Sequence, residues 1–112
     1  MSDVRNQPSV KFAGGVATVT PQGDIGTYEA SSLRTAIKQA YEQKPQKLVV
    51  DLAGVPYMAT AGLATLVEAR QLAMKSSTQL VLCGLNDRVR AVFEISRLTG
   101  VFKIVATVSD AG

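Results

Sequence analysis

The strongest constraint on the fold is a repeated change in the spacing of apolar residues along the chain. The runs KLVVDL at 47–52 and QLVLCGL at 79–85 are apolar almost throughout. Such runs are typical of strands covered on both faces of a sheet. Around them, apolar residues recur at intervals of three and four, the period of one face of a helix. We therefore expect strands to alternate with helices, which favours right-handed crossovers between parallel strands.

The first part of the chain is predicted to form a hairpin and then a helix. Residues 9–12 and 16–20 are short β-prone runs separated by AGG, which can supply the positive backbone angles of a tight turn. The helix that follows is expected to begin with Thr27 as its cap and to end before Pro45. Its inner stripe is predicted to consist of Leu33, Ala36, Ile37, Ala40 and Tyr41.

Two more helices and a last strand complete the predicted order. From Thr60 onward, the second helix has an inner stripe at Leu63, Leu66, Val67, Ala73 and Met74. Asn86 or Asp87 can cap the third helix, whose inner positions are Val89, Val92 and Phe93. Residues 101–107, VFKIVAT, are interpreted as an edge strand. The predicted fold class is α/β in one domain over 1–112: a small mixed sheet with an N-terminal antiparallel hairpin, then alternating helices and parallel strands, in the order ββαβαβαβ.

The residue types argue against catalysis and metal binding. The chain has no histidine and one cysteine, Cys83, so we expect no metal site and no internal disulfide, and Cys83 is interpreted as a small core residue. The carboxylates of Asp24 and Asp51 are not obviously paired, and Asp51 is expected to bond nearby backbone amides. The sequence has no phosphate-binding glycine loop. We therefore predict a protein that is not an enzyme and has no cofactor.

Charge and hydropathy argue against nucleic acid and membrane as direct partners. The net charge is +3, but the basic residues are scattered among acidic ones, and the densest cluster is RVR at 88–90. Direct binding to nucleic acid usually needs a concentrated basic face, so we do not expect it. No apolar run approaches the roughly 18 to 20 residues that cross a bilayer, and the first nine residues are polar. We expect no membrane insertion and a cytoplasmic location.

The loop AGVPYMATAG at 53–62 is the strongest candidate for a functional site. It follows a strand predicted to be parallel, and the carboxyl ends of such strands usually carry function. Tyr57 and Met58 either fold back onto the core, or Met58 stays exposed as a contact for a partner. Thr60 can act as an N-cap, and a phosphate on its hydroxyl would meet free amides at the helix start. Its small neighbours would permit close approach by another protein.

This loop and its flanks resemble the STAS family, which comprises the anti-sigma factor antagonists and related modules. VVDLAGVPYMATAGLATLVEA resembles the family signature, in which a strand ending in Asp and a glycine-containing turn lead into MDSSGL and a helix. VTPQGDIGTYEASSLRTAI is similar to the second strand, the G-x-L-D turn and the first helix, and LVLCGLNDRVRAVFEISRLTGVFKI to the later strand, helix and closing strand. The resemblance covers nearly the whole chain. It implies an antagonist that binds an anti-sigma factor, usually an ATP-using serine kinase, and so frees a sigma factor for transcription.

The resemblance also assigns roles to individual residues. The phosphoacceptor serine of the family falls on Thr60, and phosphorylation by the kinase would end binding. Ala59 and Gly26 stand at positions where the family carries acidic residues, and Ala61 replaces a second serine. The predicted partner-binding residues are Gly26, Met58, Ala59, Thr60, Ala61 and Gly62.

Several alternatives remain open at this point. The chain could bind its partner without a phosphorylation switch, and a phosphatase is a further partner to consider. A second hypothesis is a constitutive STAS scaffold, either in a larger signalling assembly or as a subunit of a membrane lipid ABC transporter. A nucleotide-binding domain or an enzyme is a third. The oligomeric state is left open.

Overall fold

The order of strands and helices agrees with the pattern of apolar residues. A computed structural model describes residues 7–111. Its elements are β1 (Ser9–Ala13), β2 (Val16–Thr20), α1 (Thr27–Glu42), β3 (Lys47–Asp51), α2 (Thr60–Ser76), β4 (Gln79–Cys83), α3 (Asp87–Ile95), β5 (Lys103–Val105) and α4 (Val108–Ala111). The predicted order is confirmed. The short α4 is an addition that no apolar stripe indicated.

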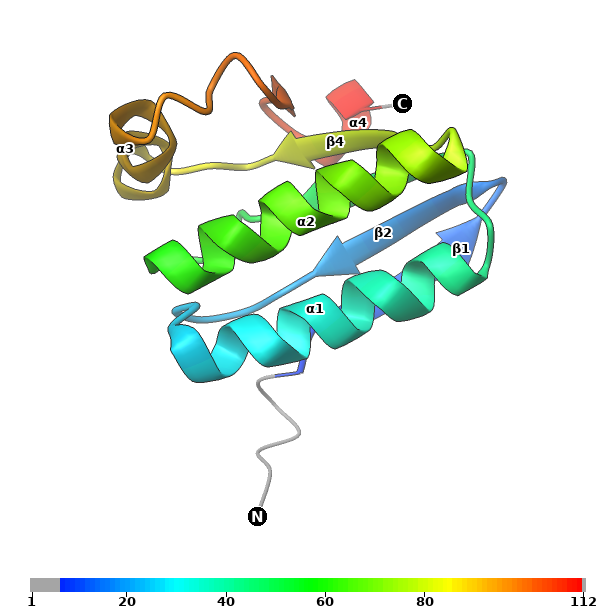
Figure 1. Cartoon of the computed structure of the whole chain (residues 1–112), viewed down its shortest axis with the longest axis horizontal. Helices are drawn as coiled ribbons and strands as arrows, with labels where there is room; N and C mark the ends of the chain where they lie inside the picture. The colour runs from blue at the N-terminus through cyan, green and yellow to red at the C-terminus, as the bar shows by residue number, and fades with distance from the viewer. Residues whose placement is uncertain (1–6, 112) are drawn as a thin grey trace.

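The strands form one mixed sheet in their sequence order, β1-β2-β3-β4-β5. β1 pairs antiparallel with β2 through the predicted hairpin, whose turn uses the positive φ angles of Gly14 and Gly15. The other pairs are parallel. Each crossover leads to the next strand in the same direction, so α1 and α2 lie side by side on one face of the sheet (Figure 1). β5 is an edge strand, as predicted.

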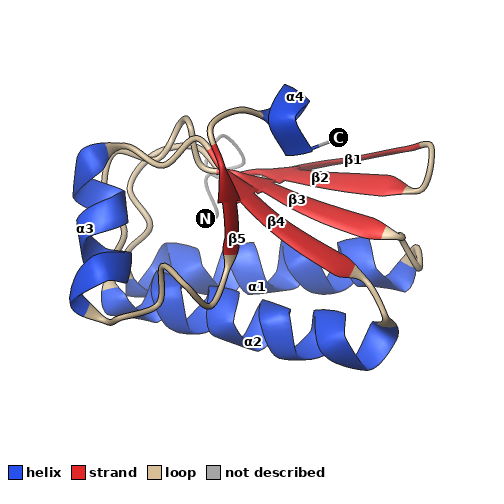
Figure 2. Ribbon diagram, turned by 90° about the horizontal axis from the view of Figure 1, so that it is seen from above, coloured by secondary structure: helices blue, strands red, loops and turns tan. Residues whose placement is uncertain are grey.

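The central strand β3 is covered on both faces, which confirms the interpretation of KLVVDL. Leu48 and Val50 are fully buried in the main core. Val49 packs on the opposite face in a smaller cluster that includes Cys83 and Ala111. Figure 2 shows α4 on this second face, across the sheet from α1 and α2. The last helical turn therefore acts as a small cover for apolar side chains that the crossover helices cannot reach.

Cys83 is the buried core residue that the sequence predicted. Burial, with the carboxylate of Asp51 nearby, raises the pKa of its thiol to about 11. A thiol in such surroundings stays protonated at neutral pH and is a poor nucleophile. Asp51 also accepts a hydrogen bond from the backbone N–H of Ala53 at 3.1 Å, the structural role expected for it.

Two details of the helices differ from the predictions. Gly26, not Thr27, is the N-cap of α1, and the carboxylate of Glu29 accepts a hydrogen bond from the Gly26 N–H. Met74 was expected in the inner stripe of α2, but it is 66% exposed. Ala69 and Ala73 hold the buried positions there, so Met74 lies past the edge of the stripe. Of the two predicted candidates for the cap of α3, the structure has Asn86, which accepts a hydrogen bond from the Val89 N–H at 2.8 Å, and Asp87 is the first helical residue.

Candidate functional site

The candidate site lies at the end of the molecule where the carboxyl ends of β2, β3 and β4 meet. The connections that leave these strands lead directly into α1, α2 and α3. In Figure 1 the start of α1, the start of α2 and the whole of α3 gather at the left end of the molecule. The carboxyl edge of a parallel sheet collects loops from several crossovers at one place, which is why such edges carry function.

Backbone hydrogen bonds join the loop before α1 to the loop before α2. The N–H of Ile25 donates to the carbonyl of Tyr57 at 2.9 Å, and the N–H of Ala59 donates to the carbonyl of Ile25 at 2.8 Å. These two bonds form an isolated parallel bridge between Ile25 and Met58. The next residue on each side, Gly26 and Ala59, is the N-cap of its helix. The bridge therefore places the starts of α1 and α2 next to each other.

Thr60 is exposed at the mouth of α2, but it is not the cap that the sequence predicted. Ala59 occupies the N-cap position with extended angles, φ −80° and ψ 168°, and makes no side-chain capping bond. Thr60 is the first helical residue. A β-region residue immediately before the helix defines the cap, so the helix begins one residue earlier than a Thr60 cap would require. The Thr60 hydroxyl is left at the surface, outside any capping bond.

The partner-binding assignments of Met58 and Gly62 are wrong, because both residues are buried. Met58 is only 1% exposed and belongs to the main core. Gly62 lies directly above it: a Cβ added to Gly62 would stand 2.8 Å from Met58 Cγ and 2.9 Å from Ile25 Cγ2. Gly62 is therefore a packing residue that lets α2 approach the bridged loops closely, and neither Met58 nor Gly62 is exposed to a docking protein.

The other predicted residues come together at the surface. Gly26, Ala59 and Ala61 are partly buried and surround the exposed Thr60. Their contact with a partner remains a prediction. The sequence reasoning overlooked Tyr28, which is 74% exposed in the first turn of α1. The spacing of apolar residues could have predicted its exposure, because Tyr28 lies outside the inner stripe of α1 that begins with Leu33.

Tyr57 is the second exposed aromatic residue at this end, with 41% of its surface accessible. Of the pair Tyr57 and Met58, one therefore points outward and the other inward. The guanidinium of Arg88 lies over the Tyr57 ring, 5.7 Å from its centroid, at a distance typical of a cation–π contact. The Asn86 side-chain amide donates to the carbonyls of Val55 at 3.2 Å and Pro56 at 3.1 Å. The start of α3 is thus fastened to the loop that presents Thr60.

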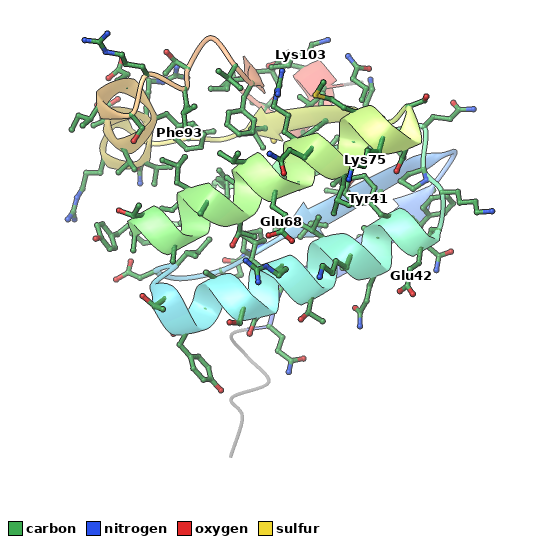
Figure 3. The ribbon with its side chains drawn as sticks, viewed as in Figure 1. Tyr41, Glu42, Glu68, Lys75, Phe93 and Lys103 are labelled. Carbon is green, nitrogen blue, oxygen red and sulfur yellow. The ribbon has the colours of Figure 1, made fainter. Side chains whose placement is uncertain are left out.

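Polar contacts join α1 to α2 along the seam between them. Figure 3 shows Glu68 and Tyr41 in the space between these helices. Glu68 pairs with Arg34 at 3.1 Å, and the Tyr41 hydroxyl donates to the Ala69 carbonyl at 2.8 Å. Burial raises the pKa of Tyr41 to about 12, so it remains a neutral donor at physiological pH. Toward the helix starts the seam opens into a hollow of about 220 Å³, lined largely by small side chains such as Ala61.

This arrangement suits recognition of a protein surface. Among residues 7–111, no group of three or more His, Cys, Asp or Glu side chains could hold a metal ion. The same part of the chain contains no helix that is both long and apolar enough to cross a membrane. What the site does offer is an exposed hydroxyl, the exposed ring of Tyr57 and the cation of Arg88 over that ring. Aromatic and arginine side chains of this kind are enriched at the centres of protein interfaces.

The alanine at the N-cap of α2 leads to a stability prediction. Substitution Ala59→Asp should raise the free energy of unfolding by about 1 kcal/mol, because a carboxylate at this position would accept a bond from a first-turn amide. The backbone of Ala59 already has the required angles, so no strain opposes the gain. Urea unfolding followed by circular dichroism measures the change. As a control, Ala64→Asp on the exposed side of α2 should be slightly destabilising, and a loss of stability in Ala59→Asp would contradict the prediction.

Comparison with known proteins identifies the family. Residues 7–111 match the STAS domain, and the chain belongs to this family. The anti-sigma-B factor antagonist of Listeria monocytogenes is 33% identical over 82 residues, which are 73% of this chain and 72% of that protein. The anti-sigma-F factor antagonist of Mycobacterium tuberculosis is 26% identical over 97 residues, covering 87% of this chain and 79% of that protein. The crystal structure of an anti-sigma factor antagonist from Mycobacterium paratuberculosis superposes with a TM-score of 0.85 at 25% identity, covering 94% of this chain and 89% of that one. The predicted family and fold class are confirmed.

Proposed function

We propose that this chain is a cytoplasmic anti-sigma factor antagonist. In this proposal, a single STAS domain binds an anti-sigma factor at the end of the molecule where α1 and α2 begin, and so releases a sigma factor. The protein acts by binding and not by catalysis. Family membership and the names of the relatives support the class of function. The exposed Thr60, at the position where the family has its phosphoacceptor, is the observation on which the choice of surface depends.

We further propose that phosphorylation of Thr60 switches binding off, with the anti-sigma factor acting as the kinase and a phosphatase restoring the free hydroxyl. The structure makes this modification physically reasonable. Thr60 is exposed, and Ala59 leaves the first-turn amides of α2 free of a side-chain cap, so a phosphate could accept bonds there without refolding. Nearly two negative charges would then occupy a surface made of Gly26, Ala59 and Ala61. Docking of the partner would have to strip water from the phosphate or bring it close to other negative charges, and either would weaken binding.

The experiment combines phosphate mapping with a binding measurement. Mass spectrometry of protein isolated from its own cells should find phosphate on Thr60. Substitution Thr60→Glu should weaken binding to the purified anti-sigma factor of the source organism by about tenfold or more, because it places a charge in the centre of the contact. Isothermal titration calorimetry gives the dissociation constants.

Substitution Thr35→Glu is the matched control. Thr35 is also an exposed helical threonine, but it lies on α1 beside a different hollow, which Gln7 and Gln39 help to line. Binding by Thr35→Glu should equal that of the wild type. Equal binding by Thr60→Glu and the wild type would refute the switch, and failure of the wild type to bind any anti-sigma factor would refute the proposed function.

A constitutive STAS scaffold is the second candidate, and one observation favours it. Gly26 and Ala59 lack the carboxylates that the resemblance leads one to expect beside the acceptor, so a kinase would meet altered surroundings at Thr60. Such a scaffold would serve a larger signalling assembly or a membrane lipid ABC transporter. Co-purification with a transporter ATPase, together with unmodified Thr60 in cells, would support the scaffold over the antagonist.

A further inference from the structure

We propose that the docking surface extends from Thr60 across Tyr57 and along one side of α3, where Arg88 receives a carboxylate of the partner and Ile95 enters an apolar socket. This inference rests on the proposed function and deepens it, because it states the chemistry of the partner surface. The argument depends on three features: the fixed position of Arg88, the unequal charge of the two sides of α3, and the exposure of Ile95.

Arg88 is a cation held in place without a carboxylate partner. Its guanidinium lies over the ring of Tyr57. The ion pair found among residues 7–111 joins Arg34 to Glu68, so no carboxylate in that range neutralises Arg88. A guanidinium over an aromatic ring still has N–H groups that can donate to the two oxygens of a carboxylate. Because Tyr57 already restricts the side chain, binding there would cost less conformational entropy than binding to a free arginine.

The two exposed sides of α3 carry different kinds of residue. Asp87, Arg90 and Glu94 follow one another at intervals of three and four, so they share one side, where two carboxylates more than offset the charge of Arg90. Arg88, Ala91 and Ile95 have the same spacing and share the other side. Only that side combines an unbalanced positive charge with apolar residues, and the contact of Arg88 with Tyr57 makes it continuous with the Thr60 loop.

Ile95 provides the apolar end of this strip. It is 83% exposed in the last turn of α3, the largest exposed fraction among the exposed large hydrophobic residues in 7–111. Its neighbours Val92 and Phe93 face inward and hold the helix on the domain, so Ile95 contributes little to the core. An interface built from an arginine over an aromatic ring and an exposed aliphatic residue, next to the exposed Tyr57, has the composition of a binding hot spot.

The nearby carboxylates do not cancel the positive charge of the side of α3 that carries Arg88. Glu29 is engaged with the N–H of Gly26, at the start of α1. Asp87 lies about 100° around α3 from Arg88 and three residues before Arg90, so it belongs to the other exposed side. Asp24 is exposed in the loop before α1, on a different connection from the one that carries Tyr57. The charge complementary to the α3 strip is therefore negative, and the partner is an anti-sigma factor with an acidic and apolar patch.

The test measures binding of the purified anti-sigma factor of the source organism to a set of single variants. Arg88→Ala and Ile95→Ala should each raise the dissociation constant about tenfold, as expected for hot-spot residues. Arg88→Glu should raise it further and should also slow association, because it replaces an attractive charge with a repulsive one. A partner variant that exchanges the facing carboxylate for lysine should restore binding to Arg88→Glu. High salt should slow association of the wild type more than that of Arg88→Ala.

Arg90→Ala is the matched control, because it removes an arginine from the same helix on the side that also carries Asp87 and Glu94. Its dissociation constant should stay within about twofold of the wild type. If Arg88→Ala binds as well as Arg90→Ala, the proposed strip is wrong while the antagonist function stands. If the wild type binds no anti-sigma factor, both the proposed function and this inference are overturned.

Discussion

Substitution Phe93→Ala is expected to lower the free energy of unfolding by about 4 kcal/mol, the usual cost of removing a large aromatic side chain from a core. Phe93 is fully buried and meets Phe102 edge to face, with ring centroids 5.6 Å apart. In Figure 3, Phe93 extends from α3 toward the rest of the domain. The substitution removes the main apolar anchor of α3, so amide exchange in that helix should accelerate together with the fall in stability. Urea unfolding and hydrogen exchange measure the two effects.

Ile95→Ala is the control for this prediction, since it shortens a large side chain in the same helix at an exposed position. Its unfolding free energy should stay within about 0.5 kcal/mol of the wild type. The pair also separates stability from recognition, because Ile95→Ala should weaken binding of the anti-sigma factor without loosening the helix. A loss below about 1 kcal/mol for Phe93→Ala would mean that the side chain is not packed as described.

Substitution Gly62→Val should destabilise the protein by about 3 kcal/mol through overpacking. Glycine inside a helix normally lowers stability relative to alanine. Helix propensity by itself would therefore favour replacing Gly62 with a residue that has a side chain. Here the new Cβ would meet Met58 and Ile25 at less than 3 Å, and both of those side chains are themselves buried. The start of α2 would have to move away from the bridged loops, and the position of Thr60 would change with it. Thermal and urea unfolding give the stability.

Ala64→Val serves as the control for Gly62→Val. It introduces the same β-branched side chain two residues later in α2, at an exposed position. Its cost should be about 0.5 kcal/mol, the difference in helix propensity. Equal unfolding midpoints for the two variants would show that Gly62 has room for a side chain, contrary to the packing described. Binding should follow the same order, with Gly62→Val the weaker binder of the anti-sigma factor.

Local patterns predicted most of the fold because each element buries one face with a fixed period. The stripe from Leu33 to Tyr41 identified α1, and the apolar run at 47–52 identified the central strand. The cap of α3 was narrowed to Asn86 or Asp87, and Asn86 takes the position, since a cap is a contact between residues only three apart. The errors fell at boundaries, where one residue decides the outcome. The caps of α1 and α2 were each predicted one residue too late, at Thr27 and Thr60, because threonine is a common cap and here glycine and alanine take that position.

The sequence by itself determined the order of elements, the family and the choice of Thr60 as the residue to examine. Only the tertiary structure decided which neighbours of Thr60 reach the surface. Tyr57 and Met58 are adjacent in a loop that has no repeating period, and their opposite orientations follow from the backbone bridge between Met58 and Ile25, thirty-three residues away in the chain. The contact of Arg88 with Tyr57 is likewise made between distant segments. The periodicity of apolar residues predicts which face of a helix or strand is buried. A contact between two loops depends instead on how the whole sheet brings those loops together.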